Sequence, residues 1–408
     1  MMTSKPVIKN ESIPAENNDS ESSTEESLAE GIIGVKNYIP ESPKKKNFLP
    51  WHRPRKQYVR EVQWCQEILK MVDEVLPENN ILKYLGLPGD DLLDLRYFHE
   101  QICEPKNIQL KYLGFNNSVS ASSKNKTEFN ISLDEVNKLR LIDPNSIVIG
   151  DDFTQIAIDD SIAWDRSKKM GPFDVINIDL CDGFGKVEPD KFIETHYNTL
   201  RKLLTLQARR SNPWLLFLTT RTGSSHIHST VFDKLCDLYC ANLNECDGFR
   251  NSSSTKFSIY DKATLNSASE TGKGISDIFI IALCKWVARI LVQQNPPSTL
   301  EAKNVIGYKV YPKADHQDLV SIAIKITPTF LPGTDNVGLA TVENHPNSVD
   351  ECAIALQVLE SVYEQIDADK ILDDDSELKA QMVSVTSELL EAARYDISYY
   401  ADWVNTSR

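Results

Sequence analysis

Residues 82–115 read LKYLGLPGDDLLDLRYFHEQICEPKNIQLKYLGF, and this stretch decides the fold. The apolar runs at 82–87 and 110–115 predict two buried strands, and residues 90–103 between them predict a helix. Strands that alternate with helices form parallel sheets whose two faces are covered by those helices. We therefore expect an α/β protein whose first two strands are parallel.

The alternation continues along the chain. Further apolar runs predict strands at 146–150, 174–180 and 214–219. Two runs at 307–311 and 319–327, joined by a short polar link, predict a hairpin. Helices are expected near residues 133–141, 164–170, 191–210, 226–244 and 276–293. The predicted fold is a Rossmann-like, mainly parallel sheet that ends in an antiparallel hairpin.

Composition limits the class of protein. The 408 residues are 41% hydrophobic and 25% charged, as in globular proteins. The net charge of -15 and the pI of about 5.0 exclude a uniformly basic coat that binds nucleic acid. No uninterrupted apolar run reaches the ~18 residues of a membrane span, and the N-terminus lacks the apolar stretch of a secretory signal. The eight cysteines are dispersed rather than arranged as a disulfide framework, so we expect a soluble, cytoplasmic protein.

Four segments differ in composition. Residues 1–43 are rich in Ser, Glu, Asn and Asp, and we expect a disordered acidic tail. Residues 44–80 hold a basic segment with interleaved aromatic residues and a first helix. Residues 81–330 form the α/β domain, and residues 331–408 form an acidic C-terminal extension of two helices around an acidic turn.

Five β-α units closed by an antiparallel hairpin resemble the class I S-adenosylmethionine-dependent methyltransferase fold. The resemblance covers about residues 56–330 and rests on the order of elements and on turn chemistry. It implies a domain that binds S-adenosylmethionine. The layout is also similar to uncharacterised bacterial methyltransferase-like proteins of defence-type gene cassettes, which implies a role in antiviral defence.

The resemblance places the cofactor at the turns that follow the first three strands, where open α/β sheets bind ligands. The usual acid before the first turn is replaced by Tyr84 or Leu85, and one glycine of the family pattern is missing. The alternative interpretation is a set of plain turns, with Asp90 capping the following helix. The implied cofactor-binding residues are Gly86, Pro88, Gly89, Asn116, Asp151, Asp152 and Phe153.

The fourth predicted strand carries the most specific signal. It ends in Asp179, and Asp182 follows in the loop NIDLCDGFG. A polar residue inside an apolar strand needs a partner or a use. Asp179 falls where the family's reaction centre lies, so Asp179 and Asp182 are the candidate catalytic residues. The neighbouring Cys181 is interpreted as a small buried residue.

Metal binding is not expected. His226 and His228 would point to different sides of a helix, since residues two apart do not share a face. Cys236, Cys240 and Cys246 lack the paired spacing of a zinc site, and core packing is the favoured interpretation.

The segment 44–60, KKKNFLPWHRPRKQYVR, is basic and holds interleaved aromatic residues. Its cations could neutralise phosphates while an aromatic ring stacks on a base. The alternative is a linker whose rings dock on the domain and whose charges pair with the acidic surface. The C-terminal helices are a second expected contact surface, for a protein partner. The candidate nucleic-acid-binding residues are Lys46, Trp51, Arg53, Arg55, Lys56 and Arg60.

Two functional hypotheses follow. The first is an S-adenosylmethionine-dependent methyltransferase that acts on nucleic acid, with the methyl group placed over residues 179–184. The second is a catalytically degenerate Rossmann-like protein that serves as an interaction or sensor subunit of a larger bacterial complex.

Overall fold

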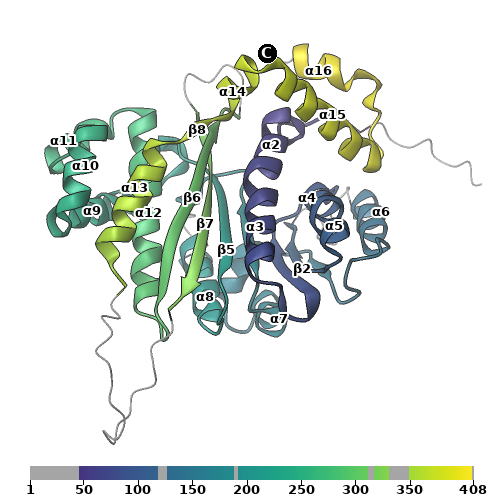
Figure 1. Cartoon of the computed structure of the whole chain (residues 1–408), viewed down its shortest axis with the longest axis horizontal. Helices are drawn as coiled ribbons and strands as arrows, with labels where there is room; N and C mark the ends of the chain where they lie inside the picture. The colour runs from purple at the N-terminus through teal and green to yellow at the C-terminus, as the bar shows by residue number, and fades with distance from the viewer. Residues whose placement is uncertain (1–45, 118–125, 188–191, 311–316, 330–348, 407–408) are drawn as a thin grey trace, which may run out of the picture. The chain divides into compact units, whose positions relative to one another are not determined.

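The structure is a computed structural model that describes residues 46–117, 126–187, 192–310, 317–329 and 349–406. Every described residue belongs to one compact unit, Lys46–Arg408. The expected disordered tail at 1–43 lies outside the described residues. Figure 1 labels the helices and strands.

One sheet of eight strands forms the centre of the described part of the chain, in the order β3-β2-β1-β4-β5-β7-β6-β8. Strands β1 to β5 are parallel to one another, β7 is antiparallel to both β5 and β6, and β8 is parallel to β6. The predicted fold class, a mainly parallel sheet with a terminal antiparallel hairpin, is confirmed. The strands are β1 (Ile81–Gly86), β2 (Gln109–Phe115), β3 (Ile147–Ile149), β4 (Val175–Asp179), β5 (Trp214–Arg221), β6 (Ser298–Tyr308), β7 (Leu319–Pro328) and β8 (Ile366–Asp367).

Strand β6 begins much earlier than the predicted residue 307. Its first half alternates buried and exposed residues and includes the charged Glu301 and Lys303, so it lacks the apolar run that marks a strand buried on both faces. A bulge between Ala302 and Asn304 interrupts the alternation as well. Strands β1 to β5 and β7 lie within two residues of their predicted bounds, and the two-residue strand β8 was not predicted.

Two helical layers cover the sheet, because successive strand residues point to opposite faces. One layer buries its apolar residues with Leu85, Ile176 and Leu216, and the other with Tyr84, Val175 and Phe217. The first layer contains α7 (Ile162–Met170), α8 (His196–Gln207), α9 (Ser229–Glu245), α10 (Asp247–Phe257), α11 (Lys262–Ala268), α12 (Gly272–Val292) and α13 (Glu351–Tyr363).

The second layer joins the two ends of the described chain. A first helix runs from α2 (Pro54–Tyr58) through a π-helical segment to α3 (Gln66–Glu74). It shares one core with α4 (Leu93–Phe98), α6 (Lys126–Asn137), α14 (Ala368–Asp374), α15 (Ser376–Ala392) and α16 (Tyr400–Thr406). Figure 1 shows α15 and α16 beside the start of α2. Helices α14 to α16 of the C-terminal extension therefore pack on the same face of the sheet as the first helix, whereas α13 packs on the opposite face.

Some predicted details are wrong. Helix α6 lies earlier than the expected 133–141, and α10 and α11 were not predicted because their sequences are mostly polar. The C-terminal extension holds α13 to α16 rather than two helices. The acidic turn is present, and Asp375 caps α15 by accepting from the N–H groups of Glu377 and Leu378.

The interpretation of Cys246 as plain core packing is also wrong. Cys246 is buried and forms a disulfide with Cys352, which joins the end of α9 to the start of α13. Their sequence separation of 106 leaves no local signal, although the Cα–Cα distance of 5.4 Å is ordinary for a disulfide. Cys236 and Cys240 are free, and no group of metal-ligating side chains occurs among the described residues. None of the helices within the described ranges is long and apolar enough to cross a membrane.

Candidate functional site

The carboxyl ends of β1 to β4 surround a cavity of about 850 Å³. Parallel sheets bind ligands at this edge, and the volume suits a small molecule. Every cofactor-binding candidate except Gly86 lines the cavity, as do both catalytic candidates. Those lining residues are Pro88, Gly89, Asn116, Asp151, Asp152, Phe153, Asp179 and Asp182.

Two glycines allow close packing around the turn after β1, one against the ring of Tyr84 and one against Pro88. Gly86 faces away from the cavity, where a Cβ atom would lie 2.5 Å from the ring of Tyr84, so it makes room for that buried ring. A Cβ atom on Gly114 of β2 would lie 2.8 Å from Pro88, so this glycine lets the first turn approach the second strand. Gly89 faces open space.

Asn116 holds this turn in place. Its side-chain amide donates to the carbonyl oxygen of Pro88 (3.1 Å) and to Oδ1 of Asp90 (3.0 Å). The alternative in which Asp90 caps the following helix is wrong, because α4 begins at Leu93 after Leu92, which is left-handed (φ 50°) and makes no side-chain cap. Asp90 instead accepts from Asn116. The side chain of Asn116 thus joins the turn after β2 to the turn after β1.

The turn after β3 is held by hydrogen bonds between near neighbours. Asp152 accepts from the N–H of Thr154 (2.8 Å) and from its hydroxyl (2.6 Å), so it caps a short helical turn as the alternative interpretation expects. Asp151 accepts from the N–H of Asp152 (2.8 Å). Phe153 packs edge-on against Phe115, with the ring centroids 5.8 Å apart, and the two rings form an apolar wall of the cavity. This end of the cavity therefore combines carboxylates with the apolar surface of two aromatic rings.

Asp179 lies at the end of β4, opposite an unexpected partner. Its Oδ1 is 2.5 Å from Nζ of Lys56, which comes from α2 and is 4% exposed. Lys56 Nζ also lies 4.3 Å from the ring centroid of Trp64. Burial raises the pKa of the Asp179 carboxyl, and the charge of Lys56 opposes that rise. The candidate catalytic carboxylate is thus one half of a buried ion pair.

Asp182 has a different environment, although it is only three residues further on. It is half exposed and accepts from the N–H of Gly183 (2.8 Å) and from Lys186 (2.6 Å), and its Oδ1 lies 2.7 Å from Nδ1 of His226. Burial alone would raise its pKa, but the hydrogen bonds from Lys186, His226 and Gly183 lower the pKa well below its usual value. Asp182 therefore remains ionised and is a poor proton acceptor.

The basic-aromatic segment contacts the rest of the domain. Arg53 stacks over the ring of Trp403 (4.5 Å), and Trp51, 43% exposed, stands at the cavity rim. These contacts match the alternative interpretation, a linker whose charges pair within the chain; binding of nucleic acid stays a prediction. The ion pairs are Lys46–Asp91 (2.6 Å), Arg55–Asp369 (2.9 Å), Lys56–Asp179 (2.5 Å) and Arg60–Asp94 (2.5 Å).

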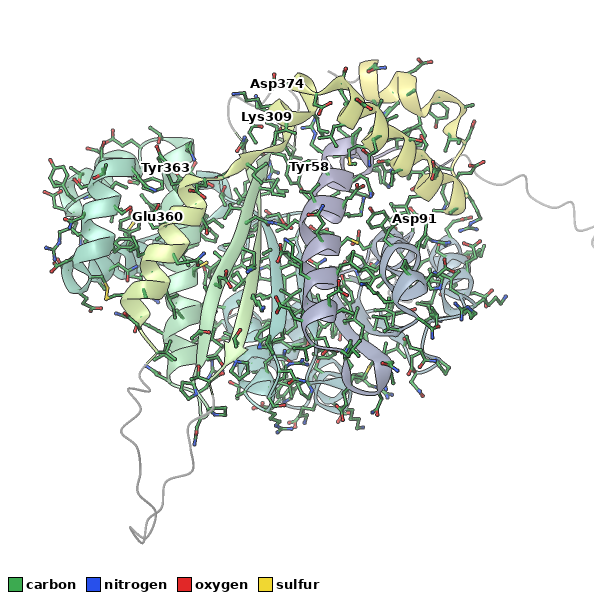
Figure 2. All side chains as sticks on the ribbon, in the orientation of Figure 1. Tyr58, Asp91, Lys309, Glu360, Tyr363 and Asp374 are labelled. Carbon is green, nitrogen blue, oxygen red and sulfur yellow. A yellow bond between two sulfur atoms is a disulfide. The ribbon has the colours of Figure 1, made fainter. Side chains whose placement is uncertain are left out.

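Tyr395 and His52 are among the site residues that were not predicted. Tyr395 follows α15, lines the cavity and donates to Oδ2 of Asp91 (2.6 Å). Asp91 is labelled in Figure 2, where the start of α4 approaches the C-terminal helices. His52 lines a second, smaller cavity of about 110 Å³ beside the first. His52 lies in the basic-aromatic segment 44–60, and a histidine among arginines and aromatic residues could have marked it as a candidate site residue. No feature of the sequence around Tyr395 indicates that it lies at the cavity.

The strand order and the cavity at the ends of β1 to β4 define an α/β protein of the class I methyltransferase type. The chain belongs to the PP_RS20740-like family, whose family model matches residues 45–405. The name of that family does not describe an activity. No protein with a curated description matches this chain.

Two solved structures are similar at low identity. A candidate class I S-adenosylmethionine-dependent methyltransferase from Listeria monocytogenes is 8% identical over 78% of this chain and 73% of that chain, with a TM-score of 0.35. A candidate spermidine synthase from Corynebacterium glutamicum is 11% identical over 72% and 71%, with a TM-score of 0.30. The class of the fold follows from the strand order, since TM-scores this low do not establish a common fold.

Proposed function

We propose that this protein binds S-adenosylmethionine in the cavity at the carboxyl ends of β1 to β4 and transfers its methyl group to an acceptor over Asp179. The observation that carries the proposal is the convergence of four strand ends on one cavity. Asp151 and Phe153 stand at one end of it, and Gly89 and Asp179 at the other. Bound S-adenosylmethionine would supply a methyl group on a positively charged sulfur.

The charge of the cavity supports this ligand. Carboxylates outnumber ammonium groups in the lining, which favours a cationic ligand over one that carries phosphates. A dinucleotide such as NAD would bring a pyrophosphate against these carboxylates. The lining carboxylates are Asp90, Asp91, Glu128, Asp151, Asp152, Asp179 and Asp182, and the lining ammonium groups are Lys46 and Lys186.

The residues present can position the reactants. The edge-on rings of Phe115 and Phe153 offer apolar surface for an adenine base, and the carboxylate of Asp151 can accept from the amino group of that base or from a ribose hydroxyl. Positioning accounts for much of the acceleration in a direct displacement, so a free general base is not required. The excess of carboxylates favours a neutral or cationic acceptor inside the cavity.

A second candidate function is a binding subunit without transferase activity. The ion pair between Asp179 and Lys56 favours it, because a carboxylate held by a buried ammonium is less able to contact an acceptor. The amide of Asn116, one of the implied cofactor-binding residues, donates to the first turn instead. Such a protein could bind the ligand and signal its presence to a partner.

Calorimetric titration tests the proposal. We expect S-adenosylmethionine and S-adenosylhomocysteine to bind at one site with micromolar affinity, and NAD not to bind. Asp151→Ala should weaken binding about tenfold or more, since a charged hydrogen-bond acceptor is lost. Asp165→Ala is the matched control, because Asp165 lies on α7 outside the cavity lining and forms an exposed ion pair with Lys169. Absence of binding by both sulfur compounds would overturn the proposal.

A further inference from the structure

The disulfide between Cys246 and Cys352 fastens the start of α13 to the end of α9. The two cysteines are 106 residues apart, and α10, α11, α12 and the β6–β7 hairpin lie between them in the chain. Cys246 is 3% exposed, whereas Cys352 is partly exposed. A thiolate from outside the protein therefore reaches the sulfur of Cys352 far more readily than that of Cys246.

The residues beside the two cysteines form a second fastening. A glutamate precedes each cysteine, Glu245 and Glu351, and both carboxylates meet the same two cations of α12. The side chain of Lys285 is 1% exposed, contacts Glu351 and lies 3.8 Å from Glu245. Arg289, one turn further along α12, lies 3.4 Å from Glu245 and 3.2 Å from Glu351. We call these four residues the charge clamp.

The charge clamp holds the two helix ends together independently of the sulfur–sulfur bond. Burial alone would raise the pKa of Glu351, but hydrogen bonds from Lys285 and Arg289 lower it, so this carboxylate stays ionised at neutral pH. When the disulfide is reduced, the charge clamp keeps the two thiols close to each other. Re-forming the bond is then an intramolecular reaction with a high effective concentration.

The rest of α13 has its own contacts. Figure 1 shows α13 beside α12 and β6. The side-chain amide of Gln357 accepts from the N–H of Ala302 on β6 (2.9 Å) and donates to its carbonyl oxygen (2.7 Å). The apolar face of α13, including Val358 and Leu359, is buried in the core of this layer. Reduction therefore frees the first turn of α13 and leaves the remainder of the helix docked.

We propose that Cys246 and Cys352 form a reversible dithiol–disulfide switch, opened by a protein whose reducing group is a Cys-x-x-Cys dithiol. One thiolate of the dithiol attacks Cys352 Sγ, and Cys246 leaves as a thiolate. The second thiolate attacks the mixed disulfide, and Cys352 leaves in turn. The dithiol loses two electrons and becomes a disulfide, and its two protons pass to the two cysteines. None of these residues lines the large cavity, so the switch adds to the proposed function a separate site.

Thiol labelling of the full chain tests the switch. The protein is treated with an oxidant or with reduced thioredoxin in the absence of denaturant, quenched in acid, alkylated in denaturant and analysed by mass spectrometry. Cys246 and Cys352 should be joined after oxidation and alkylated after thioredoxin treatment. The reduced protein should unfold at a temperature lower by roughly 5–10 °C, because a long loop is no longer closed.

Hydrogen exchange locates the change. The first turn of α13 is capped by Asp350, which accepts from the N–H groups of Cys352 (2.9 Å) and Ala353 (3.0 Å). These amides should exchange about tenfold faster in the reduced protein and in Cys352→Ser, while α8 in the same layer is unchanged. Cys240→Ser is the matched control, since Cys240 is a free, partly exposed cysteine of α9. It should leave the exchange of the oxidised protein unchanged.

A second substitution tests the charge clamp. Glu351→Gln removes one of its charges, so oxidised glutathione should re-form the disulfide about three- to tenfold more slowly than in the wild-type protein. Glu301→Gln is the matched control, since Glu301 forms a half-exposed pair with Lys303 on β6, and its rate should equal that of the wild type.

Each contrary result overturns a stated part of the proposal. A disulfide that thioredoxin reduces only in denaturant would be purely structural, and the switch would be refuted. Free thiols at Cys246 and Cys352 after oxidation would refute the switch as well. Wild-type re-oxidation in Glu351→Gln would overturn the role of the charge clamp, and unchanged exchange on reduction would overturn the release of the first turn of α13.

Discussion

The two ends of the large cavity are held in different ways. At the end of β3, near neighbours in the chain hold each other, as Asp151 does with the Asp152 N–H and Asp152 with Thr154. At the ends of β1 and β4 the partners are distant in sequence. Lys56 meets Asp179 across 123 residues, and Asp91 meets Tyr395 across 304. The first end of the cavity is held by hydrogen bonds within local turns. The second end depends on contacts between distant segments, so it forms only when the whole domain has folded.

This difference predicts where substitutions cost stability. Lys56→Met leaves the carboxylate of Asp179 buried without its partner, so the free energy of unfolding should fall by about 3–5 kcal/mol. Urea unfolding of the wild-type protein and the variant measures this difference in the free energy of unfolding. Lys138→Met is the matched control, since Lys138 forms an exposed pair with Asp134, and its effect should stay within ~0.5 kcal/mol. Equal losses in the two variants would contradict the comparison.

A double variant sharpens the same point. Asp179→Asn in the Lys56→Met background removes the unpaired charge, so it should recover part of the lost stability. Additive losses in the double variant would mean that the two side chains do not interact in solution.

The buried His52 predicts a dependence on pH. Its pKa is lowered to about 4 in the folded protein from an ordinary 6.5, so the unfolded chain binds the proton first. Its stabilising contribution is present above pH 6.5 and is lost as the pH falls toward 4. Between pH 7.5 and 4.5 the loss should be about 2–3 kcal/mol larger in the wild-type protein than in His52→Asn. Urea unfolding at both pH values checks this, and equal pH dependence would contradict it.

At the other end, losses should be smaller. Asp152→Ala removes the cap of the turn after β3 and should cost about 1 kcal/mol of unfolding free energy. Asp151→Ala should cost less stability and more ligand affinity, because Asp151 lines the cavity without capping a helix. Thermal unfolding and calorimetry of both variants give the comparison, and the opposite ranking in stability would refute it.

The smallest effect is expected at Lys186. It pairs with Asp182 near the surface, so Lys186→Ala should change the unfolding free energy by less than about 1 kcal/mol. The same urea experiment that measures Lys56→Met applies here. A loss as large as that of Lys56→Met would mean that the two candidate catalytic carboxylates share one environment.

The same difference explains what could be predicted from the sequence. Strands β1 to β5 and the turns after them depend on local patterns, so residues such as Asp151 and Asp179 could be placed at the cavity. The partners of Asp179 and Asp91 depend on tertiary packing, and no spacing links Lys56 or Tyr395 to them. The Cys246–Cys352 disulfide was not predicted for the same reason. The first half of β6 was not predicted because its apolar pattern is weak.

A crystal structure of the complex with S-adenosylhomocysteine tests the central claim most directly, since it shows both ends of the cavity at once. We predict the adenosine group between Phe153 and Asp151, and the amino-acid group beside Gly89 and Asp179. Ligand bound outside the cavity, or bound with its amino-acid group at the end formed by β2 and β3, would contradict the account.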